Sequence, residues 1–385
     1  MQQTDPKFST CLRVTAGQGF AKIFWQPACF PALPRHGFSL TGSFITLSSG
    51  GLEGRFCRIA LTWHLIISTK ITSMIQPVFS GAGRLIELAV FLLAAVAVFP
   101  AETFSVATYN LENYLVAAVG SRPAKPAAAK AKIRESIRAL KPDVLALQEI
   151  GGTNALFELR ASLQAEGLDY PYWELAGGYD TNIQVAVLSR FPITARRSHA
   201  HEGFLLDGRR FRTSRGFAEV DIQVNSKYRF TLLTAHLKSR RPVPEADEAD
   251  LREQEALLLR EKIEARLKAN PALNLVVLGD LNDVKDSRST KAVIGKGKGA
   301  LIDTRPAERN GDNEPNPVPY FSPRNITWTY HYGKEDTYSR IDYILISRAM
   351  AREWDANGTC VLAIPNWGVA SDHRPIIARF HAEER

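Results

Sequence analysis

The sequence predicts an α/β domain built on a mixed sheet, and three observations support this fold class. Short apolar runs typical of buried strands alternate with stretches whose apolar residues recur every three or four positions, as in helices. Two strand-like runs, Ala218 to Val224 and Phe230 to Leu233, are joined by the turn Asn225 to Lys227, which predicts an antiparallel hairpin. Strand after strand ends in a polar residue, which predicts a shared edge that carries chemistry.

The first half of the domain follows the order strand, helix, strand, helix, strand. The predicted elements are a strand at 104–110, a helix with Ile133, Ile137 and Leu140 on one face that Lys141 and Pro142 end, a strand at 144–147, a helix with Thr153 as N-cap and Leu156, Leu159 and Leu163 buried that Gly167 ends, and a strand at 184–188.

The second half adds a half-buried strand, a long helix and three more strands. The predicted elements are the alternating strand 218–224, its hairpin partner 230–233, a helix with Ala256, Leu259, Ile263 and Leu267 on one face and an ion pair between Glu264 and Lys268, and strands at 275–279, 341–346 and 376–380. The segment Ile302 to Asn325 has no periodicity and predicts a long loop, either functional or a surface excursion.

The front of the chain differs from the rest. Residues 1–73 show neither the helical nor the strand periodicity of apolar residues and contain three of the four cysteines, so we assign no fold to them. Residues 74–101 resemble a secretory signal peptide, because Arg84 precedes a short apolar run and Ala101 follows it; a buried core helix is the alternative. We therefore expect residues 1–73 to lie outside the native product, with translation from Met74, and residues 102–385 to form the domain.

That expectation has consequences for location and for redox chemistry. A chain that starts at Met74 is expected to be exported to the periplasm or the outside, whereas the full chain would be membrane-associated or cytoplasmic. Only Cys360 would remain after processing, which leaves no intramolecular disulfide.

The positive net charge of the chain gives little support to a globally basic surface. The total is +8, but residues 1–73 hold seven Lys or Arg and two acidic residues, which leaves 41 basic and 38 acidic residues in the remainder. Attraction to a polyanion must therefore be local.

Polar residues stand at the ends of six predicted strands. They are Asn110, Glu149, His236, Asp280 with Asn282, Asp342, and Asp372 with His373. Six such sets argue for one cleft, although any one of them also fits a polar turn that caps a strand. Carboxylate and amide oxygens without Cys ligands suit Mg²⁺ or Mn²⁺ better than zinc, and Ca²⁺ is a further alternative.

Six ordered motifs carry a resemblance to a known family. They are TYNLEN (108–113), LQE (147–149), TAHLKS (234–239), GDLND (279–283), RIDYIL (340–345) and SDHRP (371–375). In this order they resemble the endonuclease/exonuclease/phosphatase family, which includes DNase I-like nucleases, exonuclease III-like repair enzymes, sphingomyelinases and inositol polyphosphate 5-phosphatases. The resemblance implies a four-layer α/β sandwich, with two mixed sheets face to face and helices outside, that cleaves phosphoesters with a divalent metal.

The resemblance also implies a metal set. By motif match, Glu149 and Asp372 look like metal ligands and Asn110 assists them. A residue that caps a turn is the simpler alternative for Asn110.

Catalytic roles follow from the same motif match. Asp280 and Asn282 would orient and activate the attacking water and hold a phosphate oxygen. His373, paired with Asp342, would donate a proton or hydrogen bond, and His236 would act on the opposite side of the phosphate. Two simpler alternatives are a salt bridge from Asp342 to Arg340 and a core position for His236, whereas Asp283 is expected to serve only its loop.

The substrate class stays open between several phosphoesters. His236 stands where exonuclease III-like enzymes usually carry Tyr, which disfavours abasic-site cleavage. Two basic runs near the site favour a polyanion, with Arg215 and Lys238 as phosphate-binding candidates; a solvated charged loop is the alternative. The runs are Arg209, Arg210, Arg212 and Arg215, and Lys238, Arg240 and Arg241.

The leading prediction is a metal-dependent phosphodiesterase that acts as a nuclease on DNA or RNA by activated-water attack. A sphingomyelinase-like or inositol-phosphate phosphoesterase that acts on a membrane lipid or inositol phosphate is the alternative, and a non-catalytic binding protein on the same fold is a third. Trp328 and Tyr330 are candidates for stacking on a base or sugar, with a core position as the alternative for Trp328. The sequence indicates no protein partner, and we expect a monomer.

Overall fold

Two six-stranded mixed sheets form the centre of the computed structural model, which describes residues 103–309 and 325–383. The first sheet has, in spatial order, β15 (Trp354–Val361), β16 (Ile376–His381), β1 (Thr103–Tyr114), β2 (Val144–Ile150), β4 (Gln184–Ser189) and β3 (Tyr172–Ala176). The second has β11 (Ile302–Asp303), β14 (Asp342–Ile346), β10 (Leu275–Asp280), β9 (Arg229–His236), β8 (Ala218–Gln223) and β5 (Ile193–Arg196).

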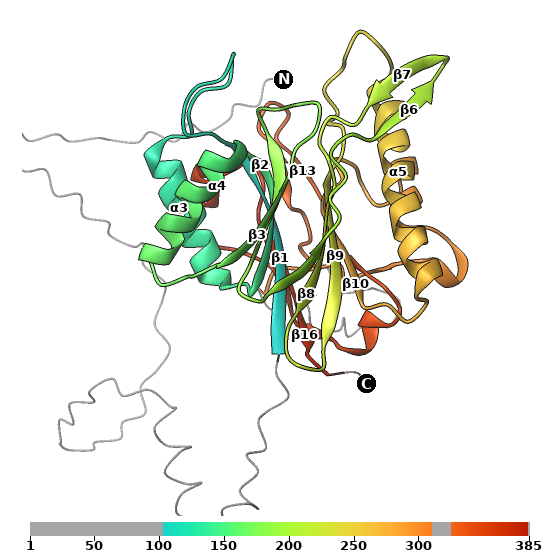
Figure 1. Ribbon diagram of the computed structural model, residues 1–385. Helices are drawn as coiled ribbons and strands as arrows, with labels where there is room; N and C mark the ends of the chain where they lie inside the picture. Colours follow the sequence, from blue (N-terminus) through green and yellow to red (C-terminus); the bar gives the residue numbers. More distant parts are fainter. Residues whose placement is uncertain (1–102, 310–324, 384–385) are drawn as a thin grey trace, which may run out of the picture. The chain divides into compact units, whose positions relative to one another are not determined.

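Each sheet has a parallel pair at its centre and antiparallel neighbours outside it. The pairs are β1 with β2 and β10 with β9. Because parallel strands end at the same edge, the polar residues that follow each pair are brought together at the upper end of Figure 1.

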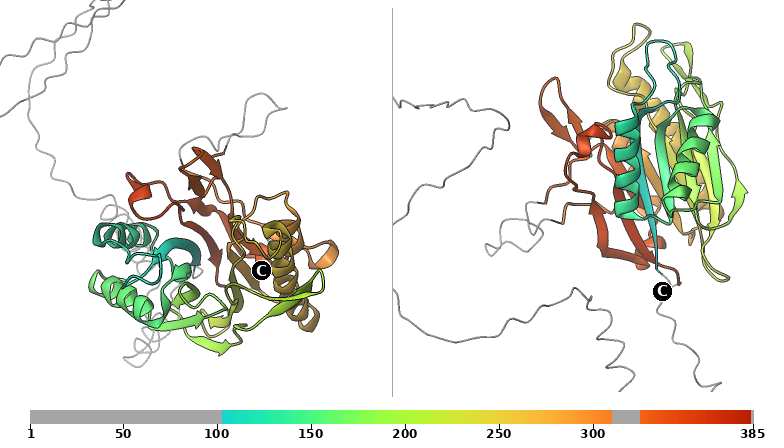
Figure 2. Two further views of the ribbon diagram at one scale, coloured as in Figure 1. Left: turned by 90° about the horizontal axis from the view of Figure 1, so that it is seen from above. Right: turned by 90° about the vertical axis from the view of Figure 1, so that its left-hand side faces the viewer.

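Helices cover the outer face of each sheet. Figures 1 and 2 show α3 (Ala127–Leu140) and α4 (Gly152–Ala165) on one side and α5 (Glu248–Ala269) on the other. The shorter helices are α6 (Arg288–Ile294), η1 (Gly297–Gly299), η2 (Met350–Arg352) and η3 (Trp367–Val369). Two small hairpins complete the elements: β6 (Gly203–Leu206) with β7 (Arg209–Arg212), and β12 (Tyr330–Tyr332) with β13 (Thr337–Ser339).

Three apolar clusters separate these layers. One lies between the sheets and contains the stacked rings of Phe104 and Phe230, whose centroids are 5.0 Å apart. A second packs the first sheet against α3 and α4, and a third packs the second sheet against α5 and α6. The four-layer α/β sandwich with two mixed sheets is therefore confirmed.

Local interactions set where the helices begin and end. Two details differ from the prediction: the N-cap of α4 and the partner of Glu264. Helix α3 ends at Lys141, whose left-handed φ of 49° and following proline stop it. Helix α4 begins at an N-cap of Gly151, so Thr153 lies within its first turn and the predicted Thr153 cap was wrong. The predicted pair of Glu264 with Lys268 was also wrong, because Glu264 accepts a hydrogen bond from Arg260 at 2.9 Å instead.

Strand β8 is half-buried as predicted at Asp221 and Gln223, which are partly exposed, but Glu219 departs from the prediction. Glu219, expected on the solvent side, is 1% exposed and is surrounded by cations. Alternation of charged and apolar residues predicts a solvated face only where no neighbouring element supplies counter-charges, and Arg197 and Arg266 supply them here.

Several elements lacked a clear signal in the sequence. Strand β15 contains Asn and Gly and has a bulge between Asp355 and Cys360, which breaks its alternation. The segment expected as a loop from Ile302 begins with the short strand β11, and residues 310–324 of that segment lie outside the described residues.

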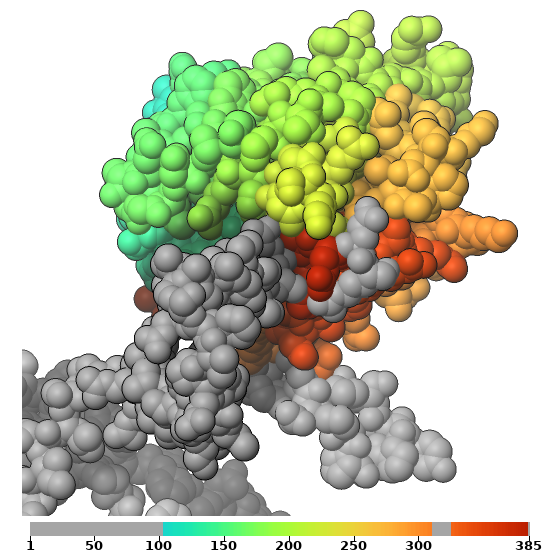
Figure 3. Space-filling view, turned by 60° about the horizontal axis from the view of Figure 1, so that its bottom comes forward, coloured from blue at the N-terminus to red at the C-terminus, as the bar shows by residue number. Residues whose placement is uncertain are grey.

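The lower end of the sandwich carries the turn between β8 and β9. Figure 3 turns this end forward and shows the turn in yellow beside the last strand in red. The amide of Asn225 donates to the carbonyl of Ala382 at 3.0 Å, which ties the hairpin to the chain's last strand.

The predictions for the front of the chain concern residues outside the described part. Residues 1–73, the signal-like segment 74–101 and the start at Met74 therefore stay predictions. Within the described residues, no helix combines the length and apolar character that a bilayer crossing requires.

Candidate active site

The two sheets meet in a hydrogen bond at the edge where their parallel pairs end. Asn110 of β1 donates from Nδ2 to Oδ2 of Asp280 in β10 at 2.9 Å, and both side chains are buried. His236 of β9 lies beside them, with Nε2 at 3.4 Å from Oδ2 of Asp280. Glu149 of β2 closes the group, with Oε1 at 3.9 Å from the same His236 nitrogen. Four predicted site residues from four strands are thus brought together.

Strained backbone marks the same edge. Four non-glycine residues here have a positive φ: Glu112, Asn113, Glu149 and Asn282. Glu149, at φ 62°, follows a bulged stretch of β1 and β2, and its Oε2 accepts a hydrogen bond from the backbone N–H of Asn113 at 2.8 Å. Such conformations cost of order 1–3 kcal/mol each and cluster at functional sites, where surrounding contacts hold them in place.

Gly279 allows the last strand of this edge to approach its neighbour. Its φ is 132°, and a Cβ at this position would lie 2.0 Å from the carbonyl oxygen of Ala235 in β9. A side chain here would push Asp280 away from His236. The glycine of the GDLND motif is therefore a packing requirement of the site.

His373 and Asp342 form a buried pair in the site. Nδ1 of His373 lies 2.8 Å from Oδ2 of Asp342, and both residues are buried. Two hydroxyls fix the pair: Oγ1 of Thr329 accepts from the backbone N–H of Asp342 at 3.2 Å, and Oγ of Ser371 accepts from that of His373 at 3.1 Å. Ser371 also donates to the carbonyl of Asn110 at 2.9 Å, which ties the pair to β1.

The pKa values of the two buried histidines are shifted in opposite directions. Burial alone would lower the pKa of His373, but the carboxylates of Asp342 and Asp280 outweigh it and raise the pKa well above its usual value. Burial lowers the pKa of His236 well below its usual value, and the nearby charge of Arg215 adds to this effect. His373 is therefore a cation at neutral pH and His236 is neutral.

Asp280 lies between these histidines. Burial raises its pKa; the charge of His373, with Nε2 at 3.7 Å from Oδ2, opposes this, and Asp342 adds to the rise. Asn282 supports the carboxylate, because its backbone N–H donates to Oδ1 at 2.8 Å and its amide to Oδ2 at 3.3 Å. A carboxylate with a raised pKa and fixed orientation suits a general base.

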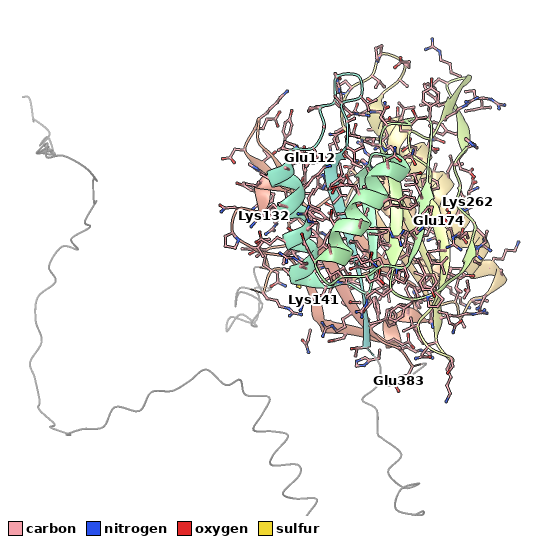
Figure 4. The ribbon with its side chains drawn as sticks, turned by 60° about the vertical axis from the view of Figure 1, so that its left-hand side comes forward. Glu112, Lys132, Lys141, Glu174, Lys262 and Glu383 are labelled. Atoms are coloured by element: carbon pink, nitrogen blue, oxygen red, sulfur yellow. The ribbon has the colours of Figure 1, made fainter. Side chains whose placement is uncertain are left out.

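A second group of carboxylates lies at the mouth of the site. Burial raises the pKa of Asp372 to about 6, and the charges of Glu112 and Glu149 add to the rise although His373 opposes it. Figure 4 shows Glu112 at the end of the domain opposite to Lys141 and Glu383. Glu112 and Glu149 thus act on Asp372 by their charge, although Glu112 also pairs with Lys125 at 3.2 Å, and carboxylate oxygens suit a hard divalent cation.

A different trio also has metal-like spacing. One ligand atom from each of Asp280, Asp342 and His373 lies within 4.8 Å of the others. His373, however, already holds Asp342 through Nδ1 and carries a positive charge, whereas a metal ligand must be a neutral imidazole. The trio is therefore better suited to proton donation than to metal binding.

The two phosphate-binding candidates are placed differently. Arg215 is 6% exposed, donates from Nη2 to the carbonyl of Leu237 at 2.7 Å, and has a buried Nε without a partner among the described residues. Lys238 donates from Nζ to the carbonyls of Ser239 and Arg241, so its ammonium is committed to its own loop. Arg215 has a free donor for an anion, whereas Lys238 has not been brought to the cluster.

The alternatives raised for other residues are also decided by contacts. Asp342 makes no surface pair with Arg340, which instead binds Asp303 at 2.6 Å. Asp283 bonds its own loop, as expected, by accepting from the backbone N–H of Val284 at 3.0 Å, and it also ties that loop to α5 through Arg252 at 3.0 Å. Trp328 is partly buried and packs at a tilt against Tyr338, with ring centroids 4.8 Å apart.

Sequence reasoning missed three residues of this site and named a fourth, Tyr330, only as a stacking candidate. Thr329 and Ser371 hold the His373 pair, Glu112 crowds Asp372, and Tyr330 places its ring 4.8 Å from that of His373. Glu112 and Ser371 stand inside the TYNLEN and SDHRP motifs, which was a usable signal. Thr329 and Tyr330 lie in a segment without periodicity, and only the fold brings them to the site.

Comparison with known proteins identifies the family. The family model described as endonuclease/exonuclease/phosphatase matches residues 107–373, which contain every residue of the cluster described above. The chain belongs to the endonuclease/exonuclease/phosphatase family. Members of this family depend on divalent metals and typically hydrolyse phosphodiester bonds. A search of curated proteins finds no match to the sequence.

Solved structures of the same fold are similar at low sequence identity. Beta toxin from Staphylococcus aureus has a TM-score of 0.50 at 18% identity, over 71% of this chain and 99% of that chain. Sphingomyelinase C from Streptomyces griseocarneus has 0.48 at 19%, over 72% and 99%, and truncated TDP2 from Caenorhabditis elegans has 0.47 at 15%, over 73% and 98%. At these identities the beta-toxin match supports the fold, and the substrate stays open.

Proposed function

We propose that this family member is a metal-dependent nuclease that hydrolyses DNA or RNA phosphodiester bonds by attack of an activated water. The observation that carries the proposal is the pair of buried histidines in opposite charge states on either side of Asp280. Environments that push two pKa values apart create an acid and a hydrogen-bonding partner within one site.

The proposed divalent ion, Mg²⁺ or Mn²⁺, would be held by Glu149 and Asp372, with Glu112 and Asn110 beside them. When bound, it would neutralise charge that develops on the phosphate. Asn110 is a weaker candidate than the carboxylates, because its Oδ1 already accepts a hydrogen bond from the backbone N–H of Glu112 at 3.0 Å.

Asp280 would accept the proton of the attacking water. Its raised pKa brings it toward the range in which a carboxylate removes protons near neutral pH. Asn110 and Asn282 donate to this carboxylate and keep it aimed at one position. Positioning of this kind accounts for a large part of phosphoryl-transfer catalysis.

His373 would supply the positive charge and the proton that the leaving oxygen needs. Asp342 holds Nδ1, which leaves Nε2 to face Asp280 and the phosphate. His236, which is neutral, would donate a hydrogen bond to a phosphate oxygen on the other side, and the free Nε of Arg215 would add a charged donor.

A substrate panel with chelation tests the proposal. Duplex DNA, single-stranded DNA, RNA, sphingomyelin and phosphoinositides are each offered with Mg²⁺, Mn²⁺ or Ca²⁺, and we expect nucleic acid cleavage that EDTA abolishes. His373→Ala should lower kcat by a factor of about 10² to 10⁴. His381→Ala, at the other end of β16, is the matched control. Hydrolysis of sphingomyelin or inositol phosphates by a protein inert on DNA and RNA would overturn the substrate assignment.

A further inference from the structure

Exposed arginines lie on the hairpin that precedes the site. Arg209, Arg210 and Arg212 of β7 are exposed, and none of them has a carboxylate partner among the residues described. Arg241, in the loop after β9, is also exposed and unpaired there. Most other arginines of the domain are in ion pairs, so this group carries uncompensated positive charge.

The hairpin is braced against the domain. Phe204 of β6 stacks on Phe211 of β7, with ring centroids 5.8 Å apart, and Phe204 lines a hollow with Leu257 and Leu258 of α5. Lys262 of α5, labelled in Figure 4, binds Glu202 at 3.0 Å just before β6. The arginines therefore stand on a supported element, which reduces the entropy lost when a ligand orders them.

Strand alternation sets the direction of the arginines. Arg210 and Arg212 point to the face of β7 opposite to Phe211, which packs toward α5, and they lie about 7 Å apart along the strand. Gly203 lies across from Arg212 and leaves room over the hairpin for its side chain.

The same strand leads into the active site. Only Thr213 and Ser214 separate Arg212 from Arg215, so their Cα atoms are at most about 11 Å apart. Arg215 binds the carbonyl next to His236, and Figure 1 shows β6 and β7 at the end of the domain toward which β9 runs. Arg210, Arg212 and Arg215 thus form a row of guanidinium groups from the surface to the reacting groups.

We propose that this row binds successive phosphates of a polynucleotide strand whose scissile bond lies at His236 and His373; its exposed part, Arg210 and Arg212, is here called the arginine arm. The inference rests on the proposed function and deepens it, because it names an extended polynucleotide strand as the substrate. A strand with one phosphate per nucleotide matches guanidinium groups at regular intervals, and each bidentate contact is charge-assisted.

An anionic membrane fits the hairpin less well. Phe204 and Phe211 face each other and α5, and Leu205, at 66% exposure, is the one large apolar side chain that the hairpin exposes. Stable membrane attachment takes a second, apolar or acyl signal in addition to a few basic residues.

Salt dependence of binding tests the arm. Fluorescence anisotropy measures the Kd of a labelled single-stranded 30-nucleotide DNA in the His373→Ala background, so that the strand stays intact, from 50 to 300 mM KCl. Each phosphate contact on a single strand contributes a slope of about −0.7 in log K against log salt. We expect Arg210→Gln with Arg212→Gln to reduce the magnitude of that slope by about 1.4.

Matched variants separate a local contact from general charge. Arg229→Gln with Arg348→Gln removes the same charge at the opposite end of the sheets and should leave the slope unchanged, and Arg210→Lys with Arg212→Lys should restore most of it. An equal slope for the arm and control variants would overturn the arm. So would loss of binding to phosphatidylserine vesicles by the arm variant with the DNA slope unchanged.

Cleavage by the otherwise wild-type protein distinguishes this inference from the proposed function. The arm variant should lose at least about tenfold more kcat/KM on the 30-nucleotide strand than on a dinucleotide at 150 mM KCl. A protein that binds the strand through the arm but cuts no nucleic acid would refute the proposed function and leave the arm standing. A protein that cuts the strand with no difference between arm and control variants would refute the arm and leave the proposed function standing.

Discussion

Replacing Asp342 with Asn tests whether catalysis depends on a buried positive charge at His373. The amide keeps the shape of the carboxylate and can still accept from Nδ1, which lies 2.8 Å from Oδ2, but the negative charge is lost. Two unit charges about 4 Å apart interact by about 4 kcal/mol at an effective dielectric constant of about 20. Loss of this attraction removes the largest effect that raises the pKa of His373, so burial, which lowers that pKa, favours the neutral form.

Single-turnover cleavage at saturating enzyme measures the consequence. Loss of a charged proton donor should lower the rate of Asp342→Asn by a factor of about 10² to 10³, with little change in the Kd for substrate. The control is Asp303→Asn, which breaks the ion pair to Arg340 nearby but touches neither histidine, and it should stay within a few-fold of the wild type. A folded Asp342→Asn protein that retains more than a tenth of the wild-type rate would refute the reasoning.

Two further predictions concern stability. Burial would raise the pKa of Glu219, but hydrogen bonds from His199, Arg197 and Arg266 outweigh it and lower the pKa to about 2. A depressed carboxylate pKa stabilises the fold above the unfolded-state pKa, and this stabilisation is lost as pH falls toward the folded-state pKa. Urea unfolding should therefore show that the free energy of unfolding falls by up to about 3 kcal/mol between about pH 5 and 2, and Glu219→Gln should flatten this dependence. Equal pH slopes for the two proteins would contradict the prediction. Gly279→Ala should lower the free energy of unfolding by more than about 3 kcal/mol or prevent folding, because its Cβ would meet the carbonyl of Ala235. The control Gly120→Ala, at φ 59° with open space around it, should lower it by about 1 to 2 kcal/mol. Similar unfolding midpoints for the two variants would contradict the prediction.

The layers of the fold could be predicted because the central strands carry continuous apolar runs. Leu275 to Gly279 and Val144 to Leu147 are buried on both faces, and the helices between strands carry one apolar stripe each. Two edge strands were not predicted, because β5 alternates over only four residues and a bulge breaks the alternation of β15. The burial of Glu219 could not be predicted either, because it depends on arginines far away in sequence.

The site was predictable where its residues follow strands and unpredictable where the hydrogen bonds come from loops. The motifs brought attention to Asp280, His373 and Asp342, and the contacts among them are those of one cluster. The direction of Lys238 was not predictable, because the same motif letters allow its ammonium to bind a substrate or its own backbone. The role of Thr329 depends on a segment that reaches the site only after the chain has folded.

The position of the site between the sheets couples its geometry to the docking of the two halves of the sandwich. Below Asn110 and Asp280, Thr108 of β1 donates to Gln148 of β2 at 3.0 Å, and Gln148 donates to Thr234 of β9 at 3.3 Å. These three side chains are buried, so the polar bridge between the sheets is satisfied only when the sheets are in register. A shift of one sheet against the other would leave buried donors unpaired and would also separate the carboxylate of Asp280 from Asn110. The polar layer therefore gives the apolar core a single register, and that register holds His373, Asp280 and Glu149 at one edge.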